Sequence, residues 1–167
     1  MATGTDFQCA IHPWGSLGAL KYVVVCSFYE GRLLLSRHRR RSTWETQGGH
    51  IEPGETPLDA ARRELFEESG VREARLYPVC DYHGWDAVSQ ADGAVFLAVV
   101  ERLGTLPDSE MGETRLFDAL PEELTYPSVT PALFRAAMEY AAAHAIRVQT
   151  PRREAPRPCG ADGPTCE

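Results

Sequence analysis

Apolar residues follow two different periods along the chain, and each period predicts a type of secondary structure. Residues 22–29 and 32–38 are rich in β-branched, aromatic and aliphatic side chains, and Glu30-Gly31 between them is a turn sequence. We therefore expect a β-hairpin there. Four further strand-like runs lie between stretches rich in Asp, Gly, Ser and Pro, at residues 44–47, 74–80, 94–103 and 114–117.

Two helices are predicted as well. The first covers residues 57–69, because Thr56 can cap its start and Gly70 can take the left-handed conformation that ends it. The second covers residues 132–146, where apolar side chains recur at helical spacing after Thr130-Pro131. Strands interleaved with two separated helices predict a sheet with helices packed on its faces.

The chain is expected to hold one folded domain. Its 167 residues, 43% hydrophobic and 25% charged, are typical of a single globular unit. Residues 1–20 show little periodicity and are expected to be a loosely structured lead-in with room for one short strand. Residues 21–146 form the predicted domain. Residues 147–167 turn to Arg, Pro, Gly and Thr with little apolar surface, which predicts a disordered tail.

Charge and composition exclude several classes of protein. A net charge of −7 gives no general attraction to polyanions, so nucleic-acid binding would depend on the local basic cluster at residues 37–41. No apolar run approaches the roughly 20 residues that cross a bilayer, and no secretory leader is recognisable, so we expect a cytoplasmic protein that does not bind membranes. Five cysteines without CxxC spacing predict neither a zinc site nor a disulfide scaffold.

Candidate chemistry is concentrated in residues 49–71, which read GHIEPGETPLDAARRELFEESGV. On the predicted helix, Glu64, Glu67 and Glu68 stand at i, i+3 and i+4, so the three carboxylates project from one face. Like charges this close repel one another. The arrangement becomes favourable around a hard divalent cation, and oxygen ligands suit Mg²⁺, with Mn²⁺ as a substitute.

Acidic residues on a helix more often form a solvated face, so the three carboxylates alone do not predict a site. The whole segment is more specific. It has a glycine, then Glu55 after five residues, then Arg63-Glu64 after seven more, followed by an aliphatic residue, paired glutamates, a glycine and an aliphatic residue. All nine specified positions match the Nudix box, and the chain resembles the small MutT-like members of that family.

The resemblance implies a fold, a reaction and residue roles. The fold would be a Nudix α/β/α sandwich with a mixed β-sheet, in which the box forms a catalytic loop–helix–loop. The reaction would be Mg²⁺-dependent hydrolysis of a phosphoanhydride bond in a nucleoside diphosphate linked to another group. Glu64, Glu67 and Glu68 would bind the metal, with Glu67, Glu68 and Arg63 as catalytic residues. Glu55 would help to organise the box.

The substrate is less well determined than the reaction. The MutT-like layout puts a nucleoside triphosphate diphosphatase first, of the kind that acts on 8-oxo-dGTP. Nucleotide sugars, dinucleoside polyphosphates and RNA 5′ ends are alternatives, as is a nucleotide-sensing module without catalysis, although the complete acidic set favours a hydrolase. The expected partner is a small nucleotide or another diphosphate. No stable nucleic-acid complex is expected, and the protein would be a monomer or homodimer.

Candidate substrate-binding residues lie on both sides of the predicted strand at residues 44–47. Gly48 and Gly49 would let the backbone approach a ligand closely, and Arg39 and Arg40 could reach phosphates, although a solvated basic turn is an equal alternative for each. Trp44 could supply a stacking wall for a base. Further aromatic candidates for that wall are Tyr82, His83 and Trp85.

Two other positions carry expectations. Many Nudix relatives have Pro where this chain has Gln47, so we expect a less rigid strand end and altered substrate contacts there. The base that deprotonates the attacking water could be Glu67 or Glu68, or a glutamate outside the box. For that role we expect Glu113, at the edge of a strand, to be better positioned than Glu110 in the preceding loop.

Overall fold

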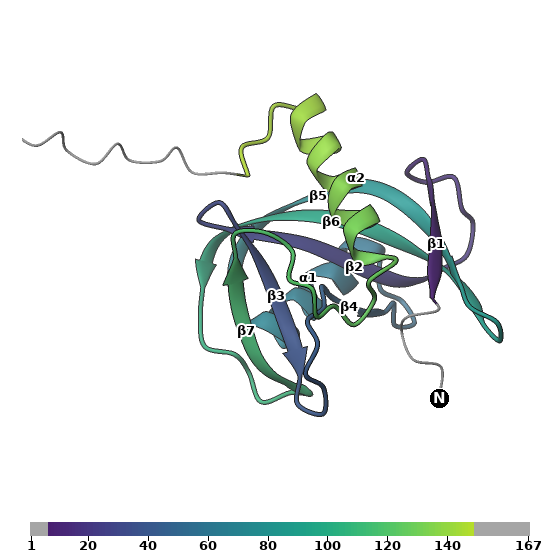
Figure 1. Cartoon of the computed structure of the whole chain (residues 1–167). Helices are drawn as coiled ribbons and strands as arrows, with labels where there is room; N and C mark the ends of the chain where they lie inside the picture. The colour runs from purple at the N-terminus through teal and green to yellow at the C-terminus, as the bar shows by residue number, and fades with distance from the viewer. Residues whose placement is uncertain (1–6, 149–167) are drawn as a thin grey trace, which may run out of the picture.

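The computed structural model describes residues 7–148. Seven strands and two helices follow one another along this part of the chain (Figure 1). In chain order they are β1 (Gln8–His12), β2 (Leu20–Tyr29), β3 (Arg32–His38), β4 (Gln47–His50), α1 (Pro57–Ser69), β5 (Val71–Trp85), β6 (Gln90–Leu103), β7 (Met111–Phe117) and α2 (Thr130–Ala143).

The strands form one mixed sheet in the order β1-β5-β6-β2-β3-β7, and β4 also pairs with β2. β2 and β6 run parallel, whereas the other pairs are antiparallel. Figure 1 shows α2 standing over one face of the sheet, with α1 behind the strands. No helix in residues 7–148 is long and apolar enough to cross a membrane.

Successive residues of the central strands supply two separate cores, because neighbouring side chains in a strand point to opposite faces. Val25 and Leu34 pack in the core that includes α1, whereas the adjacent Cys26 and Leu35 pack in the core that includes α2. One helix therefore covers each face. This confirms the predicted α/β/α sandwich with a mixed sheet.

The helix α1 begins and ends where the sequence predicts. The backbone N–H of Asp59 donates to the Thr56 hydroxyl, and the Asp59 carboxylate accepts from the Thr56 backbone, so two N–H groups at the helix start are satisfied. Gly70 ends the helix at φ 77°, a conformation that favours glycine, and its N–H donates to the Phe66 carbonyl.

Several strand boundaries differ from the prediction. β5 and β6 are longer than predicted, since each continues through residues of low strand propensity, such as Gly84 and Gly93, where the sequence pattern gives no strand signal. β1, from the lead-in, pairs with the extended end of β5. β7 begins at Met111, and α2 ends at Ala143 rather than at residue 146. The predicted disordered tail lies outside the described residues except for Arg147 and Val148.

The expected strand at residues 44–47 is displaced toward the C-terminus. The strand that forms is β4, which begins at Gln47 and continues through both glycines to His50, pairing with β2. Trp44 and Glu45 make only isolated bridges to Leu124 and Ser36. The paired glycines thus belong to the sheet, which fixes their backbone against α1.

Candidate active site

The backbone of β4 lies directly against the acidic face of α1. The Gly48 N–H donates to the Glu68 carboxylate at 2.8 Å. A Cβ atom on Gly49 would collide with the Glu64 carboxylate, and one on Gly48 would collide with the Val23 carbonyl. Glycine at both positions is therefore what allows two box carboxylates to lie against this strand.

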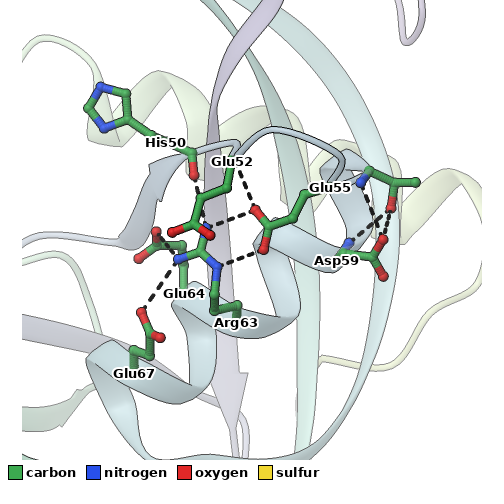
Figure 2. A network of polar contacts seen from close by, with 8 residues as sticks. His50, Glu52, Glu55, Asp59, Arg63, Glu64 and Glu67 are labelled. Atoms are coloured by element: carbon green, nitrogen blue, oxygen red, sulfur yellow. Dashed lines mark hydrogen bonds and ion pairs between the residues drawn. The ribbon is translucent and has the colours of Figure 1, made fainter.

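Arg63 holds the start of the box together (Figure 2). Its guanidinium donates to both oxygens of Glu55 at 2.7 and 3.0 Å, to Glu64 at 2.7 Å and to the His50 carbonyl at 2.9 Å, with Glu67 farther away at 3.4 Å. Hydrogen bonds from Arg63 are the main reason that the pKa of Glu55 falls to about 2. This geometry fits the organising role expected for Arg63 and Glu55.

Glu68 is the most electrostatically perturbed carboxylate of the box. Burial raises its pKa to about 8, against the lowering effect of the hydrogen bond from Gly48, and the nearby charges of Glu64, Glu45 and Glu110 raise it further. Four acidic side chains thus lie close enough to influence one another. A cation placed among them would relieve their mutual repulsion.

Glu45 and Glu110 both line the cleft beside the box. Glu45 was not a candidate from the sequence and is only 8% exposed, and Glu110 was expected to be less well positioned than Glu113. Glu110 precedes β7, and its carbonyl accepts from the Arg39 N–H at 2.9 Å, which ties this loop to the end of β3. The two residues are about 70 positions apart in the sequence, so no local pattern predicts the contact.

Glu113, the expected base, lies elsewhere. It faces β3 from within β7, where Arg37 and Arg115 hold its carboxylate at 2.9 and 2.6 Å and lower its pKa. It does not line the cleft, whereas Glu110 does. Glu110, and not Glu113, therefore lies beside the box. β7 begins at Met111, earlier than predicted, so Glu113 lies within the strand, opposite Arg37.

The cleft has a volume of about 610 Å³, and its lining holds two chemically different groups of residues. Glu45, Glu110 and the paired glycines of β4 form the group that we call the acidic end. The rings of Phe7, Tyr22, His50, Tyr82 and Tyr126 form the group that we call the aromatic end. The two groups adjoin, because Tyr126 lies near Arg41, which is paired with Glu45.

Of the four aromatic residues proposed for a stacking wall, only Tyr82 lines this cleft. Trp44 is buried, 5.0 Å from the Phe117 ring and with the Arg115 guanidinium 4.7 Å above it, so it has no open face for a base. His83 and Trp85 stack on each other in a separate, shallow surface hollow.

The basic cluster is largely neutralised by acidic neighbours. Arg39 donates to Asp108 at 2.7 Å, and the exposed Arg40 does not line the cleft either. Arg41 differs from both, because it donates to Glu45 in the cleft wall at 2.9 Å. Within the basic cluster, Arg41 is thus the candidate arginine whose side chain pairs with a carboxylate of the cleft wall.

Gln47 does not have the expected role. It is fully buried, accepts from the Ser27 hydroxyl at 2.8 Å and donates to the Ser36 hydroxyl at 2.8 Å and the Leu34 carbonyl at 3.2 Å. The Ser36 hydroxyl in turn donates to the Glu68 carbonyl at 2.8 Å. The strand end is therefore not loose as expected, since hydrogen bonds of Gln47 and Ser36 join three strands and the end of α1. The expected change in substrate contacts stays a prediction.

The donor set at the acidic end fits a hard divalent cation. Glu64 and Glu68 lie on successive turns of α1, and the glycine backbone of β4 leaves room for their carboxylates. Glu67 is half exposed and lies on the outer side of the helix, toward Arg63. Within residues 7–148, no three acidic, histidine or cysteine side chains converge as a ready-made metal site.

Comparison with known proteins agrees with this geometry. Residues 20–135 match the NUDIX domain family, and the chain belongs to that family. Among curated relatives, it is similar to the RNA pyrophosphohydrolases of Bartonella bacilliformis, at 41% identity over 68 residues, and Pectobacterium atrosepticum, at 33% over 63 residues. Each match covers 38% of this chain, but only 40% and 35% of those relatives' own lengths.

Solved structures show the same fold. A variant of the Bacillus subtilis pyrophosphohydrolase superposes with a TM-score of 0.68 at 26% identity, covering 80% of this chain and 90% of that one. The NUDIX domain of Shewanella oneidensis NrtR, complexed with ADP ribose, superposes with a TM-score of 0.61 at 17% identity, covering 74% and 88%. Both curated relatives carry the name RNA pyrophosphohydrolase, which corresponds to an alternative that the sequence left open, the RNA 5′ end, and not to the nucleoside triphosphate that it put first.

Proposed function

We propose that the protein is a Mg²⁺-dependent Nudix hydrolase that cleaves a phosphoanhydride bond at the 5′ end of RNA. The observation that carries the reaction class is the grouping of two box carboxylates, Glu64 and Glu68, with Glu45 and Glu110 of the cleft wall. The choice of RNA is supported by the similarity to RNA pyrophosphohydrolases. The polyphosphate would lie at the acidic end, and the rest of the bound RNA would extend out of the cleft into solvent.

In this reaction water attacks one phosphorus atom, the bond to the bridging oxygen breaks, and RNA with a 5′-monophosphate is released with pyrophosphate or phosphate. Glu64, Glu67 and Glu68 would hold the metal. When bound, Mg²⁺ neutralises phosphate oxygens and lowers the pKa of a coordinated water. The remaining work falls to side chains that position these groups.

Three features of the chain do the positioning. Arg63 fixes the direction of Glu64 while binding Glu55, so the box loop and helix keep one geometry. The Gly48 N–H aims the Glu68 carboxylate. Glu110 reaches the cleft from outside the box and is the candidate to take the proton from the attacking water, as a general base must lie near that water.

Arg41 is the candidate for a substrate phosphate. It is bound to Glu45 in the cleft wall, and its guanidinium has further donors that could meet phosphate oxygens in a bidentate manner. Arg39 and Arg40 remain proposals for outer contacts with the RNA backbone. They are secondary to Arg41 because, within residues 7–148, neither side chain pairs with a carboxylate of the cleft wall, whereas Arg41 pairs with Glu45.

The test is a substrate comparison with purified protein and Mg²⁺. Short RNAs carrying a 5′-triphosphate or 5′-diphosphate are compared with nucleoside triphosphates, nucleotide sugars and dinucleoside polyphosphates, and products are identified by mass. We expect the highest kcat/KM on RNA, with 5′-monophosphorylated RNA as the product. Faster hydrolysis of a free nucleotide would contradict the RNA assignment and keep the hydrolase. No hydrolysis of any of them would contradict both.

A further inference from the structure

Three fully buried polar side chains form a chain of hydrogen bonds that ends at Glu68. They are Ser27 of β2, Ser36 of β3 and Gln47 of β4. None of the three lines the cleft, and their neighbours along β2 and β3 are apolar core residues. Burying a polar group costs free energy unless it finds a partner, so three polar residues together inside the sheet need an explanation.

The partners fix the direction of every hydrogen bond in this chain. The Ser27 hydroxyl donates to Oε1 of Gln47 at 2.8 Å. The Gln47 amide donates to the Leu34 carbonyl at 3.2 Å and to the Ser36 hydroxyl at 2.8 Å. Because Ser36 accepts from Gln47, its own proton goes to the Glu68 carbonyl at 2.8 Å. The chain therefore runs one way, from Ser27 to Glu68.

Glu68 is held at both its backbone and its carboxylate. It lies in the last turn of α1, where carbonyl groups lack a partner within the helix, and the Ser36 hydroxyl satisfies its carbonyl. Its carboxylate accepts from the N–H of Gly48, which directly follows Gln47 in β4. Gln47 thus links the strand that holds the carboxylate to the serine that holds the backbone of the same residue.

Ser36 also holds a second acidic residue. Its backbone exchanges two hydrogen bonds of 2.9 Å with the backbone of Glu45, whose side chain lines the cleft. The carboxylates of Glu45 and Glu68 lie near enough for their charges to influence each other. One buried serine is therefore bonded to the backbones of two acidic residues from different segments of the chain.

We propose that Ser36 and Gln47 are positioning residues of the metal site, which hold Glu68 and Glu45 in the arrangement that a divalent cation requires. The inference rests on the proposed function, because it concerns the carboxylates assigned there, and it adds two residues that lie behind them. Groups that hydrogen-bond to metal ligands set the direction of those ligands, and their loss commonly lowers metal affinity or activity by roughly 10- to 100-fold.

The test measures the binding of Mn²⁺ alone to the full chain by titration calorimetry, so hydrolysis plays no part in it. Ser36→Ala removes the hydroxyl but keeps the backbone bonds to Glu45, and Gln47→Met keeps the length of the side chain but removes its amide. We expect each substitution to weaken Mn²⁺ binding by at least about 10-fold. Wild-type affinity in both variants, measured below their melting temperatures, would overturn the proposal.

The matched control is Ser27→Ala. Ser27 is as fully buried as Ser36 and belongs to the same chain, but it lies at the end away from Glu68. Both serine variants should lower the melting temperature, whereas Ser27→Ala should weaken Mn²⁺ binding far less than Ser36→Ala. Equal losses of affinity in the two variants would mean that the chain acts through stability alone, which would contradict a positioning role.

A conservative variant and a kinetic readout complete the test. Ser36→Thr keeps the hydroxyl and should retain most of the Mn²⁺ affinity that Ser36→Ala loses, and this pair decides the outcome if Gln47→Met does not fold. At saturating Mg²⁺, Ser36→Ala should lower kcat by about 10-fold with little change in KM, because the chain holds acidic residues and not the substrate. A rise in KM at unchanged kcat would contradict the proposal.

The outcomes also separate this inference from the RNA assignment. If RNA is not hydrolysed but Ser36→Ala loses more Mn²⁺ affinity than Ser27→Ala, the RNA assignment fails and the positioning role stands. If RNA is hydrolysed while Ser36→Ala and Gln47→Met bind Mn²⁺ as the wild type does, the positioning role fails and the RNA assignment stands. A wild type that binds no Mn²⁺ would contradict the metal site and the positioning role together.

Discussion

The acidic and aromatic ends of the cleft are held in place by different forces. At the acidic end, hydrogen bonds and ion pairs from Arg63 and the β4 backbone fix the carboxylates of a single helix. At the aromatic end, rings from five segments are placed mainly by packing over glycine backbone. Because different forces hold the two groups of residues, substitutions can test each group separately.

The largest effect is expected at the acidic end. Glu68→Gln keeps the shape of the side chain but removes charge from the proposed metal site, so turnover should fall by at least about 100-fold, or about 2.7 kcal/mol of transition-state stabilisation. Excess chelator should have a similar effect on the wild type. The control is Glu73→Gln, an exposed partner of Arg102 outside the cleft. Near-normal turnover of the Glu68 variant would refute the assignment of the acidic end.

A second, smaller loss is expected outside the box. Glu110→Gln should lower kcat by about 10- to 100-fold with little change in KM, in the range typical of a general base. Glu113→Gln should have little effect, because two arginines hold that carboxylate away from the cleft. Steady-state kinetics of both variants decide the matter. The reverse ranking would restore Glu113 as the base.

Gly49→Ala tests the fit between β4 and α1. The added methyl group would collide with Glu64, so the carboxylate must move and turnover should fall by about 10-fold, or about 1.4 kcal/mol. The control is Gly18→Ala, because a Cβ on Gly18 meets no atom within 4 Å. Equal turnover in the two variants would show that this close approach does not matter for catalysis.

Gly93→Ala makes the same change at the aromatic end. The methyl group would overlap the Tyr82 ring in the cleft wall, so KM for the substrate should rise by about 5-fold, roughly 1 kcal/mol, with little change in kcat. Steady-state kinetics measure both constants. An equal loss in kcat would show that the two ends of the cleft are not independent.

The smallest effect is a dependence of stability on pH. Arg37 and Arg115 lower the pKa of Glu113 in the folded protein, so its ion pairs stabilise the fold above the unfolded pKa of about 4.3 and lose that contribution as pH falls through the lower folded value. Partial exposure limits the contribution to about 1 kcal/mol or less. Denaturation of wild type and Glu113→Gln should therefore differ at neutral pH and converge in acid. A constant difference would contradict this.

The sequence predicted the acidic end well because its information is local. Helix α1, its cap and its three glutamates lie within 23 consecutive residues, and their spacing alone places them on one face. The role of β4 could not be predicted as well from the sequence, because the fit of Gly49 to Glu64 depends on how the sheet packs against the helix.

The aromatic end could not be predicted in the same way. Phe7, Tyr22, Tyr82 and Tyr126 meet only after β1, β5, β6 and β2 have paired, and no spacing along the chain encodes that meeting. Glu110 was ranked below Glu113 for the same reason. Trp44, in contrast, was expected at the ligand but is buried, with its ring packed against Phe117 and under Arg115.

Gln47 constrains how this site can evolve. Changing it to the proline that is common in relatives would leave the buried Ser27 hydroxyl without its acceptor, and a buried polar group without a partner costs about 1–3 kcal/mol. Proline would also remove the donor on which Ser36 depends. The hydrogen bonds of Gln47, Ser27 and Ser36 therefore depend on one another, and a single substitution of Gln47 by proline would lower the stability of the fold.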